Sequence, residues 1–273
     1  IPFCLITNKE RISYPTKKFK HLKDELIYKK IKFFIKKNIN VNFIKKLSDK
    51  KTIIFSVNCS WIFSKELLNH FSNRVYNYHS ASLPEFRGAA CHSWRLMQNK
   101  YSTYINIHKV HEKIDTGDIV RRKKINFSKN YNNLRMSYDY MEKDEKKLFT
   151  DFLFKKHNAL KQGQNSFYWP RLNTNKDALI DWKWNAKDIV DFCNAFDKPF
   201  DGAFSYINNV KVRFTNVKLI EKNTKFHPFQ SGIIFRINSK GYYIATNLGA
   251  LLVKNFKTNT KINLGNRFYS YKK

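Results

Sequence analysis

The sequence predicts an α/β domain followed by a small, mainly β domain. Three features support this: strand-like runs alternate with helical stripes in the first part, a segment rich in Asn, Gly and Pro covers 162–175, and short strands broken by turn residues follow it. With 273 residues and 42% apolar composition, the chain can form two packed cores. We expect domains at 1–165 and 176–273, joined by a linker at 166–175.

The first domain opens with a short apolar run that predicts a strand at 3–7, and the absence of a basic leader argues against a signal peptide. The apolar residues at 20–37 follow a helical period, which predicts a helix with lysines on its other face. The β-branched run at 52–57 is typical of a strand buried on both faces. Ser64 is well placed to cap a helix that ends near Phe71.

The next strand, at 74–78, carries polar residues at its C-terminal end. Asn77 lies in it and His79 follows it directly, and ligands bind at this edge of open α/β sheets. The remaining elements expected in this domain are a helix at 94–97, strands at 103–110 and 118–127, and a long helical region at 134–160.

The second domain begins with a helix at 185–196, for which Asn185 supplies an N-cap. Short strand-like segments broken by Asn and Gly then fill 202–256. Their spacing suits a small OB-like barrel of five or six strands, whose exposed edges would also allow a homodimer.

Composition limits the functions of the chain. The net charge is +31, yet Arg accounts for only 11 of the 52 basic residues. Arg is the preferred residue for reading phosphates and bases, so we interpret the charge mainly as a lysine-rich surface and regard nucleic acid as an unlikely partner. No apolar run is long enough to span a membrane. Four widely spaced cysteines predict no metal site and suit a reducing cytoplasm.

A constellation of polar residues in the first domain carries the chemistry. Asn77 and His79 are two residues apart, so on a strand they point the same way. The amide can donate to a developing oxyanion, and the imidazole can take a proton from an amine. Asp115 could orient that imidazole, and the loop from Pro84 to Gly88 could form a pocket wall. Each motif is common by itself, and Asp-Thr-Gly is a common turn. Taken separately, they are therefore also compatible with a purely structural role for these residues.

The combination is more specific. Asn-x-His, then Ser-Leu-Pro-x-aromatic-Arg-Gly, then Asp-x-Gly 36 residues after His79, resembles the formyltransferases that use 10-formyltetrahydrofolate. The segments Tyr-Trp-Pro-Arg at 168–171, Ile-Asp-Trp at 180–182 and Phe-Asp-Gly-Ala at 200–203 are similar to the linker and second domain of two-domain members. The resemblance implies a Rossmann-like catalytic domain with an Asn77, His79 and Asp115 triad, and no metal.

The resemblance also implies the walls of the site. The expected folate contacts are Asn58, Trp61, Ile62, Phe63, Ile114, Thr116 and Asp118. The expected substrate contacts are Ser82, Pro84, Arg87, Gly88, Tyr168, Trp169, Arg171 and Trp182. Aromatic rings would stack on a base and Arg171 would pair with a diphosphate. Alternatively, Trp182 packs between domains and Arg171 serves a structural ion pair.

Three functions compete. The chain is most similar to the N-formyltransferases of dTDP- or UDP-linked amino deoxysugars, cytoplasmic enzymes that serve surface polysaccharides such as the lipopolysaccharide O-antigen. A methionyl-tRNA formyltransferase would usually be longer and open with a different loop. A non-catalytic RNA- or polyanion-binding protein on the same fold would show steeply salt-dependent binding and no formyl transfer.

Overall fold

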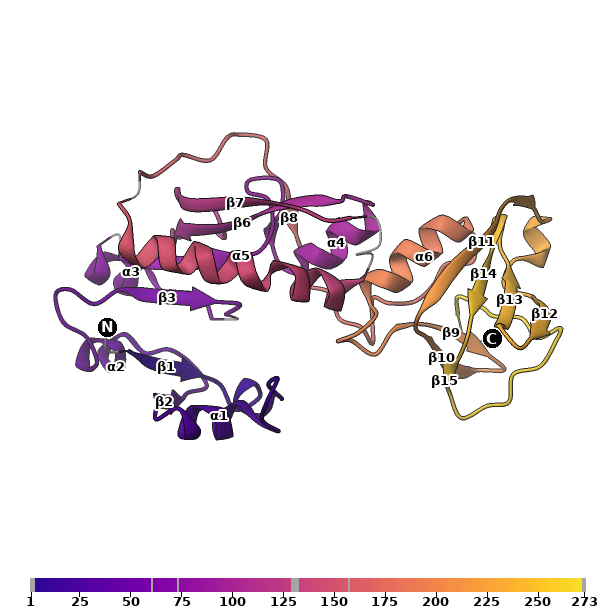
Figure 1. Ribbon diagram of the computed structural model, residues 1–273, viewed down its shortest axis with the longest axis horizontal. Helices are drawn as coiled ribbons and strands as arrows, with labels where there is room; N and C mark the ends of the chain where they lie inside the picture. Colours follow the sequence, from indigo (N-terminus) through magenta and orange to yellow (C-terminus); the bar gives the residue numbers. More distant parts are fainter. Residues whose placement is uncertain (1–2, 60, 73, 129–132, 157, 272–273) are drawn as a thin grey trace. The chain divides into compact units, whose positions relative to one another are not determined.

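The computed structural model describes residues 3–59, 61–72, 74–128, 133–156 and 158–271 (Figure 1). Ile1 and Pro2, at the start of the apolar run, lie outside this part. Residue contacts divide the chain into two compact units, Ile1–Tyr76 and Asn77–Lys273. This boundary falls inside a strand, so it leaves the expected linker at 166–175 as a prediction.

The first unit contains a small parallel sheet and short helices. Strand β1 pairs in parallel with β2, in a register that joins Cys4 to Lys32 and Thr7 to Ile35. Strand β3 lies beside the start of β4, where the Ile54 amide donates to the Arg74 carbonyl at 2.9 Å. The elements are β1 (Cys4–Thr7), η1 (Arg11–Ser13), α1 (Leu22–Tyr28), β2 (Lys32–Ile35), α2 (Val41–Lys46), β3 (Ile54–Val57) and α3 (Lys65–Phe71).

The helix expected at 20–37 is wrong in its second half. Helix α1 ends at Tyr28, and Lys30 has a positive φ of 54°, which stops a right-handed helix. The following Lys-Phe-Phe-Ile segment forms strand β2 instead. Its aromatic and β-branched residues fit a pleated surface better than a helix. Farther along, Ser64 caps α3 as expected, because its side chain accepts from the Leu67 amide.

The second unit starts with a sheet ordered β4, β6 and β7. Strands β6 and β7 are antiparallel, with an irregularity between Ile107 and His108, and helix α5 packs mainly on β7 (Figure 1). A short parallel pair joins Arg87 to Tyr168. The elements are β4 (Val75–His79), β5 (Arg87–Gly88), α4 (Cys91–Met97), β6 (Ser102–Lys109), β7 (Ile119–Asn126), α5 (Leu134–Phe154) and β8 (Tyr168–Trp169).

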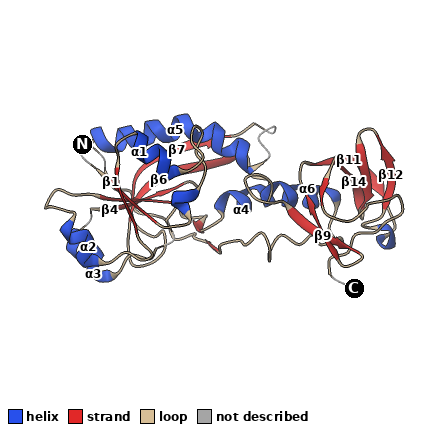
Figure 2. Ribbon diagram, turned by 90° about the horizontal axis from the view of Figure 1, so that it is seen from below, coloured by secondary structure: helices blue, strands red, loops and turns tan. Residues whose placement is uncertain are grey.

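The rest of this unit is helix α6 and two antiparallel sheets (Figure 2). The strand orders of the two sheets are β15-β10-β9 and β11-β14-β13-β12. Trp182, Phe214 and Phe268 lie in their shared core, where Trp182 stacks on Phe268. The elements are α6 (Ala186–Ala195), β9 (Ala203–Ile207), β10 (Val210–Phe214), β11 (Val217–Lys225), η2 (Pro228–Gln230), β12 (Ile234–Asn238), β13 (Gly241–Ala245), β14 (Leu248–Val253) and β15 (Phe256–Lys257). Across the described residues, no helix is long and apolar enough to cross a membrane.

Candidate active site

The three predicted catalytic residues lie together in the second unit. Asn77 and His79 come from the end of β4, and Asp115 comes from the turn between β6 and β7, where its φ is 53°. The Asn77 amide nitrogen lies 3.4 Å from Asp115 Oδ1, and His79 Nδ1 lies 3.6 Å from Asp115 Oδ2. The structure therefore places an amide, an imidazole and a carboxylate side by side.

His79 has a defined tautomer. Its Nε2 lies 2.5 Å from the Phe86 carbonyl oxygen, and a carbonyl only accepts, so Nε2 carries the proton. In the neutral ring, Nδ1 is then the basic nitrogen, and it faces Asp115 at more than hydrogen-bond distance. Burial lowers the pKa of His79 more than the nearby Asp115 carboxylate raises it. The ring is thus neutral near pH 7 and can accept a proton at Nδ1.

Cys91 contacts this histidine, and His92 follows Cys91 in helix α4. The Cys91 thiol donates to the same Phe86 carbonyl at 3.3 Å and lies 3.8 Å from His79 Nε2. Burial raises the pKa of Cys91 to about 12, so it remains a thiol. His92 is buried next to it, and neither ring nitrogen has a hydrogen-bond partner among the described residues. Burial lowers the pKa of His92 to about 3.

Asp115 is fixed as a carboxylate. Its Oδ2 accepts from the Gly88 amide at 2.8 Å. Burial would raise the pKa of Asp115, but the contact with His108, the neighbouring His79 and the Gly88 amide together lower it to about 2. Gly88 permits this approach, because a Cβ at that position would lie 2.2 Å from the Trp169 carbonyl oxygen.

His108 belongs to the cluster, although the sequence did not single it out for this site. It is 1% exposed at the end of β6, and its Nδ1 donates to the Lys109 carbonyl at 2.7 Å. Its Nε2 accepts from Asn77 Nδ2 at 3.1 Å and lies 3.3 Å from Asp115 Oδ1. A usable signal was present, because His108 ends the strand that precedes the Asp115 turn.

Gln162 was also missed, and no sequence pattern marks it. Its amide nitrogen donates to the carbonyls of Asp115 at 2.8 Å and Gly117 at 2.7 Å. Its oxygen accepts from Arg87 Nε at 3.1 Å and Nη2 at 2.9 Å. Arg87, predicted to bind substrate, is therefore held by Gln162 in this state. One side chain joins the β5 loop to the catalytic turn.

The other predicted loop residues shape the wall. The Ser82 amide donates to Thr103 Oγ1 at 3.1 Å, and Ser82 Oγ accepts from the Tyr104 amide at 3.1 Å. Pro84 follows a cis peptide bond. Ser82 thus binds the neighbouring strand, and substrate contact at these positions stays a prediction.

The segment at 168–175 leads from strand β8 to a pocket. Trp169 stacks on Phe86, and its indole donates to the Glu85 carbonyl at 3.0 Å. Tyr168 is exposed, whereas Trp182 is only 6% exposed and donates to Ser205 Oγ. Trp182 thus serves the core of the second domain, which is closer to the packing alternative.

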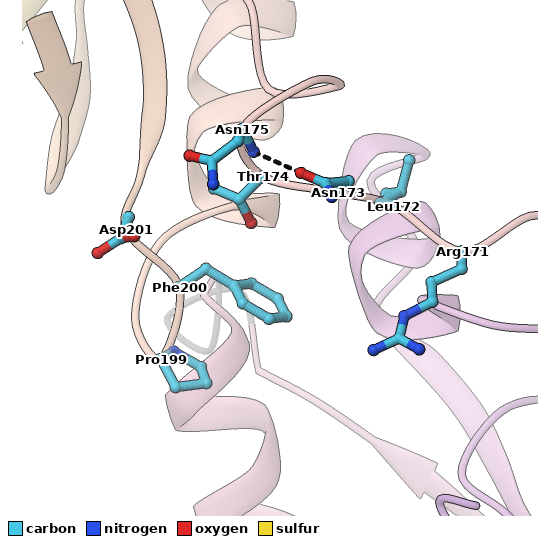
Figure 3. A pocket seen from close by; sticks show the side chains of 8 residues that line it. All are labelled: Arg171, Leu172, Asn173, Thr174, Asn175, Pro199, Phe200 and Asp201. Atoms are coloured by element: carbon cyan, nitrogen blue, oxygen red, sulfur yellow. Dashed lines mark hydrogen bonds between the residues drawn. The ribbon is translucent and has the colours of Figure 1, made fainter. Parts of the chain in front are cut away.

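Figure 3 shows the pocket, with the Arg171 guanidinium and the Phe200 ring on facing sides. It is lined by Arg171, Leu172, Asn173, Thr174, Asn175, Pro199, Phe200 and Asp201, and its volume is about 510 Å³. Among the described residues, Arg171 has no hydrogen bond or ion pair. Asp201, the acidic residue of the lining, pairs with Lys257 at 3.2 Å. The Arg171 charge is therefore available to an anion.

The residues expected to contact folate lie in both units. In the first unit, Asn58 has a φ of 48°, the Trp61 indole donates to the Lys37 carbonyl at 2.8 Å, and Ile62 is 84% exposed. Phe63 is partly buried beside them in sequence. Their role as folate contacts stays a prediction. The same holds for the predicted folate contacts in the second unit, Ile114, Thr116 and Asp118.

The predicted folate contacts of the second unit flank Asp115 in the turn between β6 and β7. Ile114 is half-exposed, Thr116 Oγ1 donates to the Lys113 carbonyl at 3.0 Å, and the Asp118 carbonyl accepts from the Lys109 amide at 2.9 Å. These bonds stiffen the turn that carries Asp115. Within the described residues, no group of three or more His, Cys, Asp or Glu side chains is arranged to hold a metal ion.

Comparison with known proteins identifies the family. Residues 3–153 match the family described as formyl transferase, and residues 173–269 match its C-terminal domain. The chain belongs to the formyl transferase family. The expected α/β fold with a second, antiparallel β domain is confirmed.

The chain is similar to two curated relatives and to one solved structure. The chain is 30% identical over 204 residues to the bifunctional polymyxin resistance protein ArnA of Wigglesworthia glossinidia brevipalpis, covering 71% of the chain but 30% of that protein. It is 25% identical over 229 residues to methionyl-tRNA formyltransferase of Clostridium tetani, covering 81% and 70%.

The solved structure is the N-formyltransferase from Helicobacter canadensis in complex with folinic acid and dTDP-3-aminofucose. It matches with a TM-score of 0.67 at 18% identity, covering 93% of this chain and 98% of that one. At this identity, the likeness supports the shared fold.

Proposed function

We propose that this chain is an N-formyltransferase that moves a formyl group from 10-formyltetrahydrofolate to the amine of a nucleotide-linked amino sugar. The observation that carries the proposal is the tautomer of His79. Its Nε2 proton is bonded to the Phe86 carbonyl, which leaves a bare Nδ1 beside the Asn77 amide and the Asp115 carboxylate. This is a proton acceptor and a hydrogen-bond donor in one place, as acyl transfer to an amine requires.

Each residue then has a chemical task. His79 Nδ1 takes the proton that the amine loses when it bonds to the formyl carbon. The Asn77 amide donates to the formyl oxygen as negative charge develops there. Asp115, ionised across the physiological range because its pKa is about 2, stabilises the imidazolium of His79. The proton is finally delivered to the nitrogen that leaves.

The formyl donor in this proposal is 10-formyltetrahydrofolate. The formyl donor supplies a formyl group already activated on nitrogen, so no metal or covalent enzyme adduct is needed. Ile114, which lies one residue before Asp115, is 49% exposed. An exposed isoleucine at the catalytic turn is suited to cover a heterocyclic ring.

The pocket that Arg171 lines supports the proposed acceptor class. Strand β8 pairs with β5, whose Gly88 amide holds Asp115, and the chain then runs two residues to Arg171. The unpaired guanidinium suits a diphosphate, and the exposed Phe200 ring suits stacking against a base or sugar. The Helicobacter canadensis relative was solved with a dTDP-linked amino sugar, which supports the same class here.

The test is turnover with a matched pair of arginine variants. Purified protein, 10-formyltetrahydrofolate and a panel of UDP- and dTDP-amino sugars should release tetrahydrofolate. Arg171→Met should raise KM for the nucleotide sugar at least tenfold with a smaller change in kcat. Arg236→Met, which removes a half-exposed arginine that pairs with Glu221, should leave both values unchanged. Absence of turnover with every sugar would refute the acceptor class.

A second candidate is formylation of methionyl-tRNA. The Clostridium tetani relative carries this name, and the net charge of +31 would attract tRNA. Charged initiator tRNA assayed beside the sugars separates the two candidates. Transfer to tRNA that falls steeply with salt, with none to the sugars, would replace the first proposal.

A further inference from the structure

A second cavity lies in the C-terminal domain, and the formyl-transfer chemistry does not use it. Its volume is about 530 Å³, within the range of small-molecule sites. The segment at 179–183, the short helix η2 and the segment at 267–271 line it. None of its lining residues belongs to the catalytic cluster or to the Arg171 pocket.

The cavity holds an arginine without a partner. Arg267 lines it, and its Nε is buried with no hydrogen-bond partner. Its guanidinium makes no ion pair with any described residue and instead lies over the Phe229 ring at 4.3 Å. A buried N–H without an acceptor is costly, so an anion that accepted from Arg267 Nε would bind with a gain.

The surrounding side chains define the rest of the ligand. Phe229 and Tyr271 are 71% and 62% exposed, although both line the cavity. Exposed aromatic rings of this size are suited to stacking on a flat heterocycle. Lys183 adds a second cation, and Asp181 offers acceptors for hydroxyl groups while its Oδ1 holds the Lys183 amide at 2.9 Å.

We propose that this cavity is a second nucleotide site, which binds a nucleoside diphosphate through Arg267, Lys183 and the Phe229 ring. The phosphates pair with the two cations, and the base stacks on the open face of Phe229. Ribose hydroxyls donate to Asp181. Hydrogen bonds join the lining segments, because Ser231 Oγ donates to the Trp182 carbonyl and the Trp182 amide donates to Ser270 Oγ at 3.1 Å.

Calorimetric titration with uridine 5′-diphosphate tests the proposal without any formyl transfer. The wild-type chain should bind two equivalents, one at each pocket. Arg267→Met should remove one equivalent, and Arg171→Met should remove the other. Phe229→Ala should weaken the C-terminal site by about tenfold to a hundredfold. Arg236→Met is the matched control, because that arginine also lies over an aromatic ring, at 4.8 Å from Tyr243, but has a carboxylate partner.

Pyrophosphate and uridine supply the separate parts of the ligand, and each should bind more weakly than the diphosphate. The second site is overturned if Arg267→Met binds as many equivalents of the nucleotide as wild type does. It is also overturned if wild type binds pyrophosphate as tightly as the nucleotide and Phe229→Ala does not weaken binding of the nucleotide. If the wild-type chain binds a single equivalent that Arg267→Met removes and Arg171→Met leaves unchanged, the proposed acceptor pocket is refuted and the second site stands, so the two proposals fail independently.

Discussion

The buried histidine beside the catalytic residues gives a prediction of acid sensitivity. His92 is 4% exposed, and its two ring nitrogens have no hydrogen-bond partner in the described structure. Burial first, and then the charge of Arg95, lower its pKa from 6.5 to about 3. Because the folded pKa is depressed, folding keeps His92 neutral, and stability is lost as the pH falls below 6.5 toward 3.

The magnitude follows from the two pKa values. At pH 5 the unfolded histidine is almost fully protonated, while the folded one stays neutral. This difference costs the folded state about 2 kcal/mol relative to pH values well above 6.5. His92→Leu removes the titration and keeps an apolar side chain of similar size. The variant should therefore be at least as stable as wild type at pH 7.5, since it no longer buries two unpaired nitrogens.

Guanidinium denaturation followed by tryptophan fluorescence at pH 7.5 and pH 5 measures the effect. Wild type should lose about 2 kcal/mol more than His92→Leu between these values. Both proteins retain His79, so its contribution cancels. His111→Leu, at an exposed histidine, is the control and should follow wild type. Equal losses in wild type and His92→Leu would refute the reasoning.

Four further predictions concern the catalytic turn and its supports. His79→Gln should lower kcat by about 10² to 10⁴ in the tetrahydrofolate-release assay; unchanged turnover would remove it as the base. Because His79 must be neutral and burial lowers its pKa, kcat/KM should be flat above pH 6.5 and fall only at lower pH. Gln162→Ala should destabilise the fold by about 1–3 kcal/mol in thermal unfolding and lower kcat. Gly88→Ala should abolish activity because its Cβ would meet the Trp169 carbonyl, whereas Gly163→Ala, with nothing within 4 Å, should be silent.

Local spacing explains which parts of the site could be predicted. Residues two apart on a strand share a face whatever the rest of the chain does, so Asn77 and His79 were predicted together. Asp115 lies far along the chain, and its place came from the family resemblance. Gln162 binds the backbone carbonyls of Asp115 and Gly117. Every residue has a backbone carbonyl, so no pattern of side chains in the sequence could indicate these contacts.

The error at 20–37 has a similar physical origin. Apolar residues there fit a helical period, but a positive φ at Lys30 divides the segment into α1 and β2. A lysine gives no sequence signal for that conformation, unlike glycine. Pairing of β2 with β1 is a non-local gain that outweighs the periodic pattern.

The hydrogen bonds of Asn77 decide how the cluster can receive a formyl group. Both Nδ2 hydrogens face acceptors within the cluster, His108 Nε2 at 3.1 Å and Asp115 Oδ1 at 3.4 Å. A formyl oxygen can use the amide only by replacing one of them. The contact with Asp115 is the longer, and its carboxylate keeps the Gly88 amide at 2.8 Å when that contact is lost. His108 would then hold the amide in place while its second hydrogen turns to the substrate, which makes His108 a positioning residue for Asn77.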